Sequence, residues 1–501
     1  MTATIPSPGS ASAEGEEQVA APAEVASGRS STDYTRRDRG LWVAGVLGAI
    51  ALAATTASLA GAGDVKLAVV PFGVVAALGL AYLALTRFEL FVLTCLFIRS
   101  SLDAIGGQGT TITNPSSLIS LAFMAAALLW LAARAHRGVR ISSTLTLPLM
   151  FFTVACLLSV FTSQLKGLSA VEFSRILSVV VMAIVLERLA VDPPAVKRIM
   201  FAAMGSALIP LLASLGTYAI GAPLMDKRAA LTDGIKRVRG TFDQANGFSR
   251  YLLFVIIMGV ALYPHLPKRW RIPMLAGLAG LGVLMILTYT RSSWLALVIG
   301  LLVVGWLQSK KLLLVLIAMG LGVALFVPSV VNRFSDLTAS NGPSTALTGE
   351  GNSLAWRFSY WTQVVNLAAD NPVTGIGLRV TEVISGGNKQ PHNDFVRAYV
   401  ELGAIGLMAY ILLLIAMARV AVRGVRDAHA GWQRGVAVGF AGCFVAFVLV
   451  SLVANVMSQA VVLWYLFAFA ACAAAVGKFG WIDKRNALRA GGQPAASAIS
   501  N

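Results

Sequence analysis

The chain has 501 residues, of which 57% are hydrophobic and 13% charged, and its mean hydropathy is +0.75. Soluble domains carry about 25% charged residues, so this composition excludes a soluble enzyme, a disordered protein and a disulfide-stapled scaffold. It predicts an all-α, polytopic integral membrane protein. The net charge of +17 would indicate nucleic-acid binding in a soluble chain. In a membrane protein it indicates basic loops that fix the topology, so we expect no nucleic-acid partner.

The first 40 residues are polar and lack apolar periodicity, which predicts a disordered tail. An arginine cluster at 36–39 directly precedes the first apolar run and favours a cytoplasmic start. The third run, 88–104, is short and ends in polar residues, so we expect it to be broken or re-entrant and the total to be about 12–14 transmembrane helices. The runs lie at 41–63, 65–86, 88–104, 115–134, 144–163, 170–190, 196–221, 246–264, 271–289, 292–308, 311–329, 395–421, 432–453 and 456–478.

Threading these helices from a cytoplasmic start predicts the domain organisation and places both termini in the cytoplasm. Most basic residues of the connections then fall on the inner side, as the positive-inside rule requires. The predicted parts are a disordered cytoplasmic tail (1–40), transmembrane helices 1–11 (41–330), a long extracytoplasmic loop (331–394), transmembrane helices 12–14 (395–478) and a second cytoplasmic tail (479–501).

Two outer segments carry more basic residues than this rule predicts. One is 222–245, and the other is the long loop at 331–394. Within the loop, residues 352–370 have aromatic and apolar side chains at helical spacing. This pattern predicts an amphipathic helix lying on the membrane surface.

Several common kinds of site do not occur in the sequence. The four cysteines lie inside apolar runs without CxxC spacing, so they favour neither a metal site nor a disulfide. No GxxxxGK[ST] phosphate loop is present. The acidic residues predicted on the outer side are scattered. We therefore expect neither a cofactor nor a bound metal.

One histidine, His392, is predicted to lie on the outer side, immediately before a membrane helix. Imidazole is the side chain best suited to move protons near neutral pH. A lone loop histidine is more often structural, but the adjacent Asn393 and Asp394 are suited to orient the ring. The other histidines fall in basic inner connections (His136, His265 and His429).

Arginines at the outer ends of helices form a second group of candidates. Arg291 lies between two apolar runs that almost touch, and a snorkelling arginine at the interface is the alternative reading. Arg239 and Asp243 are four residues apart, which puts them one turn apart if the helix begins early. Asn246 and Arg250 repeat that spacing. An ionisable residue at the depth of Arg250 indicates a functional site, with a structural Arg–Asp pair as the alternative.

Three segments, taken in order, resemble the O-antigen ligase/polymerase superfamily of bacterial envelope glycosyltransferases. The resemblance covers roughly residues 200–420, and Ala245 departs from it where the family commonly has proline. Its motifs are RGTFDQANGF (239–248), TYTRSSW (288–294) and a long loop with WR (356–357), NPVTGIG (371–377), PHNDF (391–395) and ELG (401–403).

The resemblance implies a metal-independent glycosyltransferase with a helical fold of the GT-C type. Such enzymes transfer a glycan from an undecaprenyl-diphosphate carrier to a sugar hydroxyl outside the cytoplasmic membrane, in envelope polysaccharide assembly. Carried over by motif, Arg239 and Arg291 hold the diphosphate and His392 activates the acceptor. Further substrate-binding candidates are Arg357, Arg250, Asn246, Asn393 and Asp394.

The implied partners are the lipid-linked glycan donor, a glycan or glycolipid acceptor and the bilayer. We also expect association with a flippase or a chain-length regulator. Elementary chemistry agrees with this mechanism, because arginines bind phosphate bidentately and diphosphate is already a good leaving group. Only one general base is then needed for the acceptor hydroxyl.

Alternatives stay open at this point. Within the family the reaction is either ligation of finished polymer or polymerisation of repeat units. From another class, a secondary transporter or flippase would use the arginines to line a translocation path and predicts internal repeats, which the sequence does not show. A purely structural scaffold leaves the arginines and His392 unexplained.

Overall fold

The computed structural model describes residues 65–102, 115–136, 144–221, 224–225, 237–326, 353–385 and 390–489. Across these ranges the chain forms helices and turns, with one isolated bridge between Met225 and Val238. The all-α prediction is therefore confirmed. The predicted tail at 1–40, the first apolar run at 41–63 and most of the basic segment between 222 and 236 lie outside the described residues.

Nine helices in the described part of the chain are long and apolar enough to cross a membrane. This finding confirms a multi-pass membrane protein. The helices are α4 (Pro115–His136), α6 (Lys166–Leu189), α7 (Pro193–Gly205) joined to α8 (Leu208–Ala219) as one span, α10 (Ala245–Leu262), α11 (Lys268–Leu287), α12 (Arg291–Gln308), α17 (Asp394–Asp427), α18 (Trp432–Ser451) and α19 (Ala460–Arg489).

Four further apolar helices match predicted runs: α2 (Val65–Thr86), α3 (Phe88–Ile98), α5 (Thr146–Thr162) and α13 (Lys310–Phe326). The third run is short, as expected, because α3 has only 11 residues and continues as a single 3-10 turn, Arg99–Ser101. At the other end of the chain, α19 continues to Arg489, beyond the predicted limit at residue 478.

Contacts divide the chain into two units, Met1–Tyr82 and Leu83–Asn501. In the first unit only residues 65–82, which belong to α2, are described. The candidate residues all belong to the second unit.

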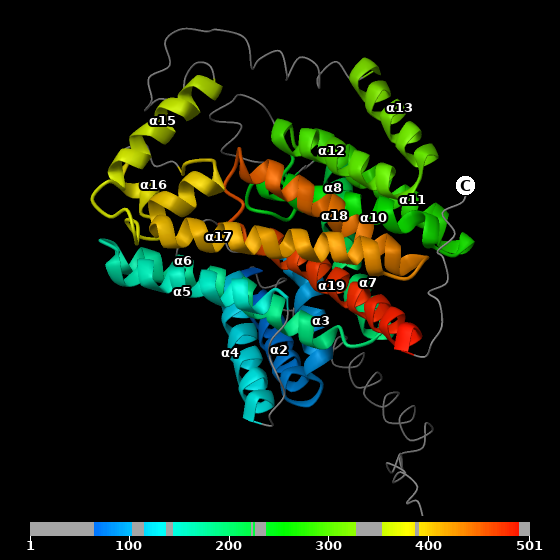
Figure 1. Ribbon diagram of the computed structural model, residues 1–501, viewed down its shortest axis with the longest axis horizontal. Helices are drawn as coiled ribbons and strands as arrows, with labels where there is room; N and C mark the ends of the chain where they lie inside the picture. Colours follow the sequence, from blue (N-terminus) through cyan, green and yellow to red (C-terminus); the bar gives the residue numbers. More distant parts are fainter. Residues whose placement is uncertain are drawn as a thin grey trace, which may run out of the picture. The chain divides into compact units, whose positions relative to one another are not determined.

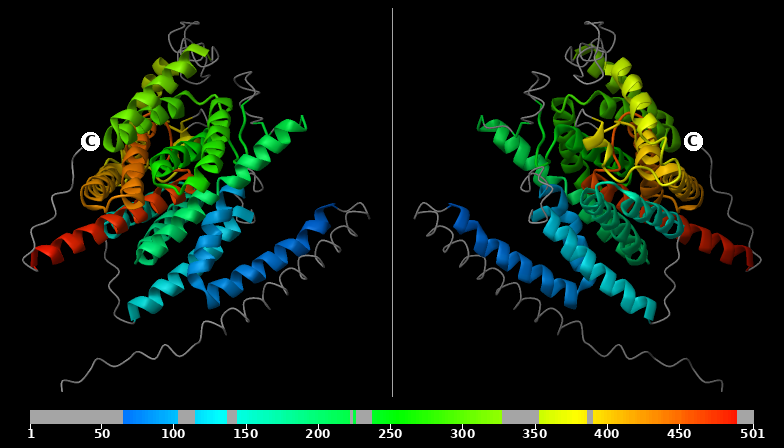
Figure 2. Two further views of the ribbon diagram at one scale, coloured as in Figure 1. Left: turned by 90° about the vertical axis from the view of Figure 1, so that its right-hand side faces the viewer. Right: turned by 90° about the vertical axis from the view of Figure 1, so that its left-hand side faces the viewer.

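The most buried helices of the second unit are α10, α18 and α19, with α12 and α17 packed against them. Glycines let two of these helices approach closely, since a Cβ added at Gly300 of α12 would lie 3.1 Å from the carbonyl oxygen of Gly442 in α18. Small residues at such crossings are how membrane helices gain packing without a hydrophobic driving force. Figures 1 and 2 show α19 in red, alongside α6, α17 and α18.

Helix α17 is bent at Gly403, which has φ +69° and ψ −167°. The segment before α16 (Thr381–Ile384) packs into this bend. The amides of Ile376 and Gly377 donate to the carbonyls of Val400 and Glu401 at 3.0 and 3.1 Å. These hydrogen bonds hold the first turns of α17, which begin inside the PHNDF motif, against the segment before α16.

Replacing Gly403 with alanine is expected to destabilise the protein strongly. The left-handed conformation costs about 1–2 kcal/mol for a residue with a Cβ, and the added carbon would collide with the Val373 carbonyl group. Thermal unfolding of the detergent-solubilised protein measures the loss. Gly282→Ala in α11 is the matched control, because nothing lies within 4 Å of its added Cβ. Equal melting temperatures for the two variants would contradict this account of the bend.

The predicted helix in the long loop is present as α15 (Ser353–Leu367). One face of α15 packs against the start of α17 and the segment between them, around a core of Tyr360, Val364, Ala368, Ile376, Val380 and Val400. Figure 1 shows α15 and α16 beside the first turns of α17. The helix is thus confirmed, and its place on a membrane surface stays a prediction.

Candidate functional site

The starts of α10 and α12 lie side by side and bring three candidate residues to one end of the bundle. Ser249 of α10 and Ser293 of α12 are linked by a hydrogen bond of 2.8 Å between their hydroxyl groups. Asn246 and Arg250 lie one turn apart on α10, as their spacing predicts, and Arg291 is the first residue of α12.

Arg237, which the sequence analysis did not single out, lies between these two helix starts. Its side chain is buried, and its Nη2 donates to Oδ1 of Asn246 at 2.6 Å and to Oγ1 of Thr290 at 2.9 Å. Its Nε donates to the carbonyl of Thr288 at 2.8 Å. No pattern in the sequence distinguishes Arg237 from Arg239, because the two flank the same valine.

Arg239 is instead engaged with the backbone around it. Its Nε donates to the carbonyl of Met225 at 3.1 Å and its Nη1 to the carbonyl of Phe242 at 2.7 Å. The early helix start that would place Arg239 and Asp243 one turn apart is wrong. Helix α10 begins at Ala245, after an extended Gln244 and a left-handed Gly240.

Arg250 is buried, since the residue is only 5% exposed. Among the described residues no acidic side chain is bonded to it, and its Nε has no hydrogen-bond partner. It interacts electrostatically with Asp394, Arg237 and Arg357. Leaving a buried cation unpaired is costly, so its retention indicates a ligand of opposite charge.

Arg357, from the long loop, lies near Arg250, as Arg237 does. It lies on α15 and is partly buried, and burial lowers the pKa of its guanidinium below the usual value. No ion pair to Arg357 occurs within the part of the chain that the structure describes. Arg237 and Arg250, on either side of the start of α10, and the distant Arg357 of α15 therefore form a cationic cluster, which we call the arginine cluster.

His392 is held in an unusual backbone conformation with φ +54°. Hydrogen bonds hold the residues before and after it. The indole Nε1 of Trp361 donates to the carbonyl of Pro391 at 2.5 Å, and Asn393 caps α17 by accepting from the amides of Phe395 and Val396. Non-glycine residues rarely adopt positive φ, and such strain concentrates at functional sites.

Asn393 and Asp394 therefore bind backbone rather than the imidazole ring. Asp394 is fully buried, and its carboxylate accepts from the amides of Val456 at 3.0 Å and Met457 at 3.2 Å. The side chain that contacts the ring is Asn455, whose Nδ2 lies 3.4 Å from Nδ1 of His392. No spacing or motif in the sequence connects Asn455 with His392, because the two residues are 63 positions apart.

A buried ionic network lies one turn further along α17, and the sequence analysis missed it. Arg397 is fully buried; its Nη2 donates to Glu172 of α6 at 3.0 Å and its Nε to Glu401 at 2.9 Å. Its Nη1 donates to Ser458 at 2.7 Å. The spacing of four between Arg397 and Glu401 was a visible signal for half of this network.

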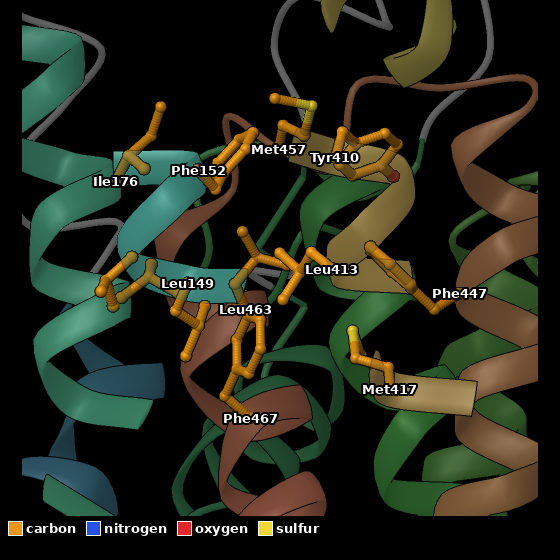
Figure 3. Close-up of a pocket in the computed structure, with 12 residues that line it drawn as sticks. Leu149, Phe152, Ile176, Tyr410, Leu413, Met417, Phe447, Met457, Leu463 and Phe467 are labelled. Atoms are coloured by element: carbon orange, nitrogen blue, oxygen red, sulfur yellow. The ribbon is translucent and has the colours of Figure 1, made fainter. Parts of the chain in front are cut away.

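A cavity between α5, α6, α17, α18 and α19 holds none of the candidate residues. Its lining is apolar and includes Phe152, Leu413, Phe447 and Leu463 (Figure 3). The four cysteines are also buried and free. In the described residues no three His, Cys, Asp or Glu side chains lie together as metal ligands would.

Comparison with known families agrees with this geometry. Residues 276–411 match the family model of O-antigen ligases. The match runs from α11 to the first half of α17 and includes Arg291, Arg357 and His392. No curated protein matches the sequence. Residues 276–411 are thus similar to O-antigen ligases, in agreement with the resemblance that the sequence motifs carry.

Proposed function

We propose that the protein transfers a glycan from an undecaprenyl-diphosphate carrier to a sugar hydroxyl, in the assembly of envelope or surface polysaccharide. The reaction takes place outside the cytoplasmic membrane, with both chain termini in the cytoplasm. The observation that carries the proposal is the arginine cluster, in which Arg250 is buried and no acidic side chain of the described residues is bonded to it. A membrane-bound diphosphate is an anion of suitable charge and shape for such a cluster.

The bond changes follow from this arrangement. The acceptor hydroxyl oxygen attacks the anomeric carbon of the donor sugar, and the bond from that carbon to the diphosphate oxygen breaks. The hydroxyl proton passes to His392, which acts as general base. Negative charge develops on the leaving diphosphate, where fixed guanidinium groups in a site of low dielectric constant stabilise it. This division of labour needs no metal ion.

The individual arginines contribute differently in this proposal. Arg250, Arg291 and Arg357 contact the diphosphate through their guanidinium groups. Arg239 contributes through Nη2, since its other two nitrogens already donate to carbonyl oxygens. Asn246 contributes indirectly, because its side-chain oxygen holds Arg237 at 2.6 Å and so keeps the start of α10 in place.

The test replaces Arg250 with methionine, which has similar length and no charge. Transfer by the purified enzyme from an undecaprenyl-diphosphate-linked donor is expected to fall about 10²–10³-fold. The melting temperature is expected to stay equal or rise, because an unpaired buried charge is removed. The matched control is Arg198→Met, which removes an exposed arginine paired with Glu89 at 2.6 Å and should change neither quantity.

The same assay is run with EDTA, which is expected to leave transfer unchanged. Normal transfer by Arg250→Met would contradict the arginine cluster as the diphosphate site, and strong inhibition by EDTA would contradict the metal-free mechanism. Movement of the lipid-linked donor across vesicles without a new glycosidic bond would instead support the transporter.

A further inference from the structure

The connection between α18 and α19 lies against the start of α17 and is tied to it at several points. The amides of Val456 and Met457 donate to Asp394, and the hydroxyl of Ser458 donates to the side-chain oxygen of Gln390 at 3.0 Å. Ser458 also accepts a hydrogen bond from Arg397. A segment about 60 residues beyond His392 is thereby fixed beside it, although the family motifs do not include this segment.

Asn455 is the residue of this connection that reaches the imidazole ring. It is 6% exposed, and its Nδ2 lies 3.4 Å from Nδ1 of His392. Its Oδ1 is buried and has no hydrogen-bond partner among the described residues. A buried amide oxygen without a donor is destabilising, and the carboxamide can exchange the positions of its oxygen and nitrogen by rotating about its last bond.

The chemistry of a general base decides which end of the amide must face the ring. A neutral imidazole has one nitrogen that donates and one that accepts, and the partner of one nitrogen fixes the role of the other. A base that acts through Nε2 must carry its proton on Nδ1, and this proton needs an acceptor. The partnerless Oδ1 of Asn455 is such an acceptor, at the position where the amide already lies.

We propose that Asn455 is a positioning residue for His392. Its Oδ1 accepts a hydrogen bond from Nδ1–H, holds the ring in the tautomer whose Nε2 is unprotonated and stabilises the imidazolium that forms when Nε2 takes the proton of the acceptor hydroxyl. This inference rests on the proposed role of His392 as base. Rotation of the amide places Oδ1 where it can accept from Nδ1–H of His392. The same hydrogen bond stabilises the tautomer that is protonated on Nδ1, which the general base requires.

Two substitutions separate an accepting role from a donating one. Asn455→Asp keeps the acceptor and loses the donor, and it is expected to retain kcat within about tenfold of the wild type. Asn455→Leu has similar size and loses both, and we expect kcat to fall about 10–100-fold with KM unchanged, because substrate binding is not involved. Gln433→Leu, which removes a buried amide at the opposite end of α18, is the control and should keep kcat.

If Asn455→Asp loses as much kcat as Asn455→Leu while both remain folded, the accepting role is wrong. The proposed function fails separately, since its failure appears as normal transfer by His392→Ala. Normal transfer by Asn455→Leu together with an inactive His392→Ala would overturn only the inference about Asn455.

A spectroscopic measurement tests the same idea without relying on the Asp variant, whose new carboxylate lies near Asp394. The full-length protein is labelled with ¹⁵N-histidine, and the His392 signals are assigned by their loss in His392→Ala. The wild type is expected to show the Nδ1–H tautomer, and Asn455→Leu should shift the population towards Nε2–H. An Nε2–H tautomer in the wild type would overturn the proposal.

Discussion

Replacing His392 with alanine is expected to lower glycan transfer by about 10²–10⁴-fold, the usual contribution of a general base. The melting temperature should change little, because alanine and histidine meet the same backbone strain at φ +54° and the ring is only partly buried. The measurement is the rate of transfer from the lipid-linked donor under conditions that saturate both substrates, together with thermal unfolding of the same preparations.

The matched control is His265→Ala. This residue follows α10 at the other end of the helix, where its Nε2 lies 2.9 Å from the side chain of Gln308. Its loss should leave transfer intact. A His392→Ala variant that is folded and transfers glycan at the wild-type rate would remove the general base from the mechanism.

Replacing Arg397 with methionine is expected to have the largest effect on stability, a loss of about 3–5 kcal/mol. Both glutamate side chains are 1% exposed, and the substitution leaves Glu401 without its cation and Glu172 with only Arg175, at 3.4 Å. Arg250→Met removes a charge of the same kind and is expected not to destabilise, because no bonded anion is left behind. Thermal or denaturant unfolding of the two variants in detergent measures this contrast.

A triple variant provides the internal check. Glu172→Gln, Arg397→Met and Glu401→Gln together remove all three charges, and stability should return towards that of the wild type, since a buried ionic group is often replaceable by neutral residues. If the single Arg397→Met variant unfolds at the wild-type temperature, the network does not hold α6 to α17 as described.

The helices could be predicted because lipid requires long apolar runs, and each run within the described residues became one helix or a broken pair. The bend of α17 could not be located in the same way. Gly403 lies inside an apolar run. Its position requires glycine because the carbonyl group of Val373, which precedes it by 30 residues, occupies the space where a Cβ would lie.

The site could be predicted where its residues are close in sequence. Asn246 and Arg250 follow from spacing on one helix, and PHNDF follows from the resemblance. Arg237, Asn455 and Arg397 were missed because their partners are Thr290, His392 and Glu172, and nothing in a single sequence pairs residues 53, 63 and 225 positions apart.

The motifs also differ in what they do, which the resemblance alone could not show. The glycines of NPVTGIG and ELG lie against each other's backbone: a Cβ at Gly375 would collide with the main chain at Glu401. These motifs therefore allow the segment before α16 to pack closely against α17 at its bend. Of the two arginines without a bonded anion among the described residues, Arg357 belongs to the WR motif and Arg250 lies just beyond RGTFDQANGF.

The bend at Gly403 also bears on the depth of the proposed reaction. At 1.5 Å per residue, the 34 residues of α17 extend about 50 Å, well beyond the ~30 Å hydrocarbon layer. The part after the bend, Ala404–Asp427, covers about 36 Å and suffices to cross the layer alone. With this part inside the membrane, the first nine residues of α17 extend past the hydrocarbon and place His392 at the level of the lipid headgroups. In the proposed reaction, a glycan or glycolipid acceptor and the diphosphate of a membrane-anchored donor can meet at this level.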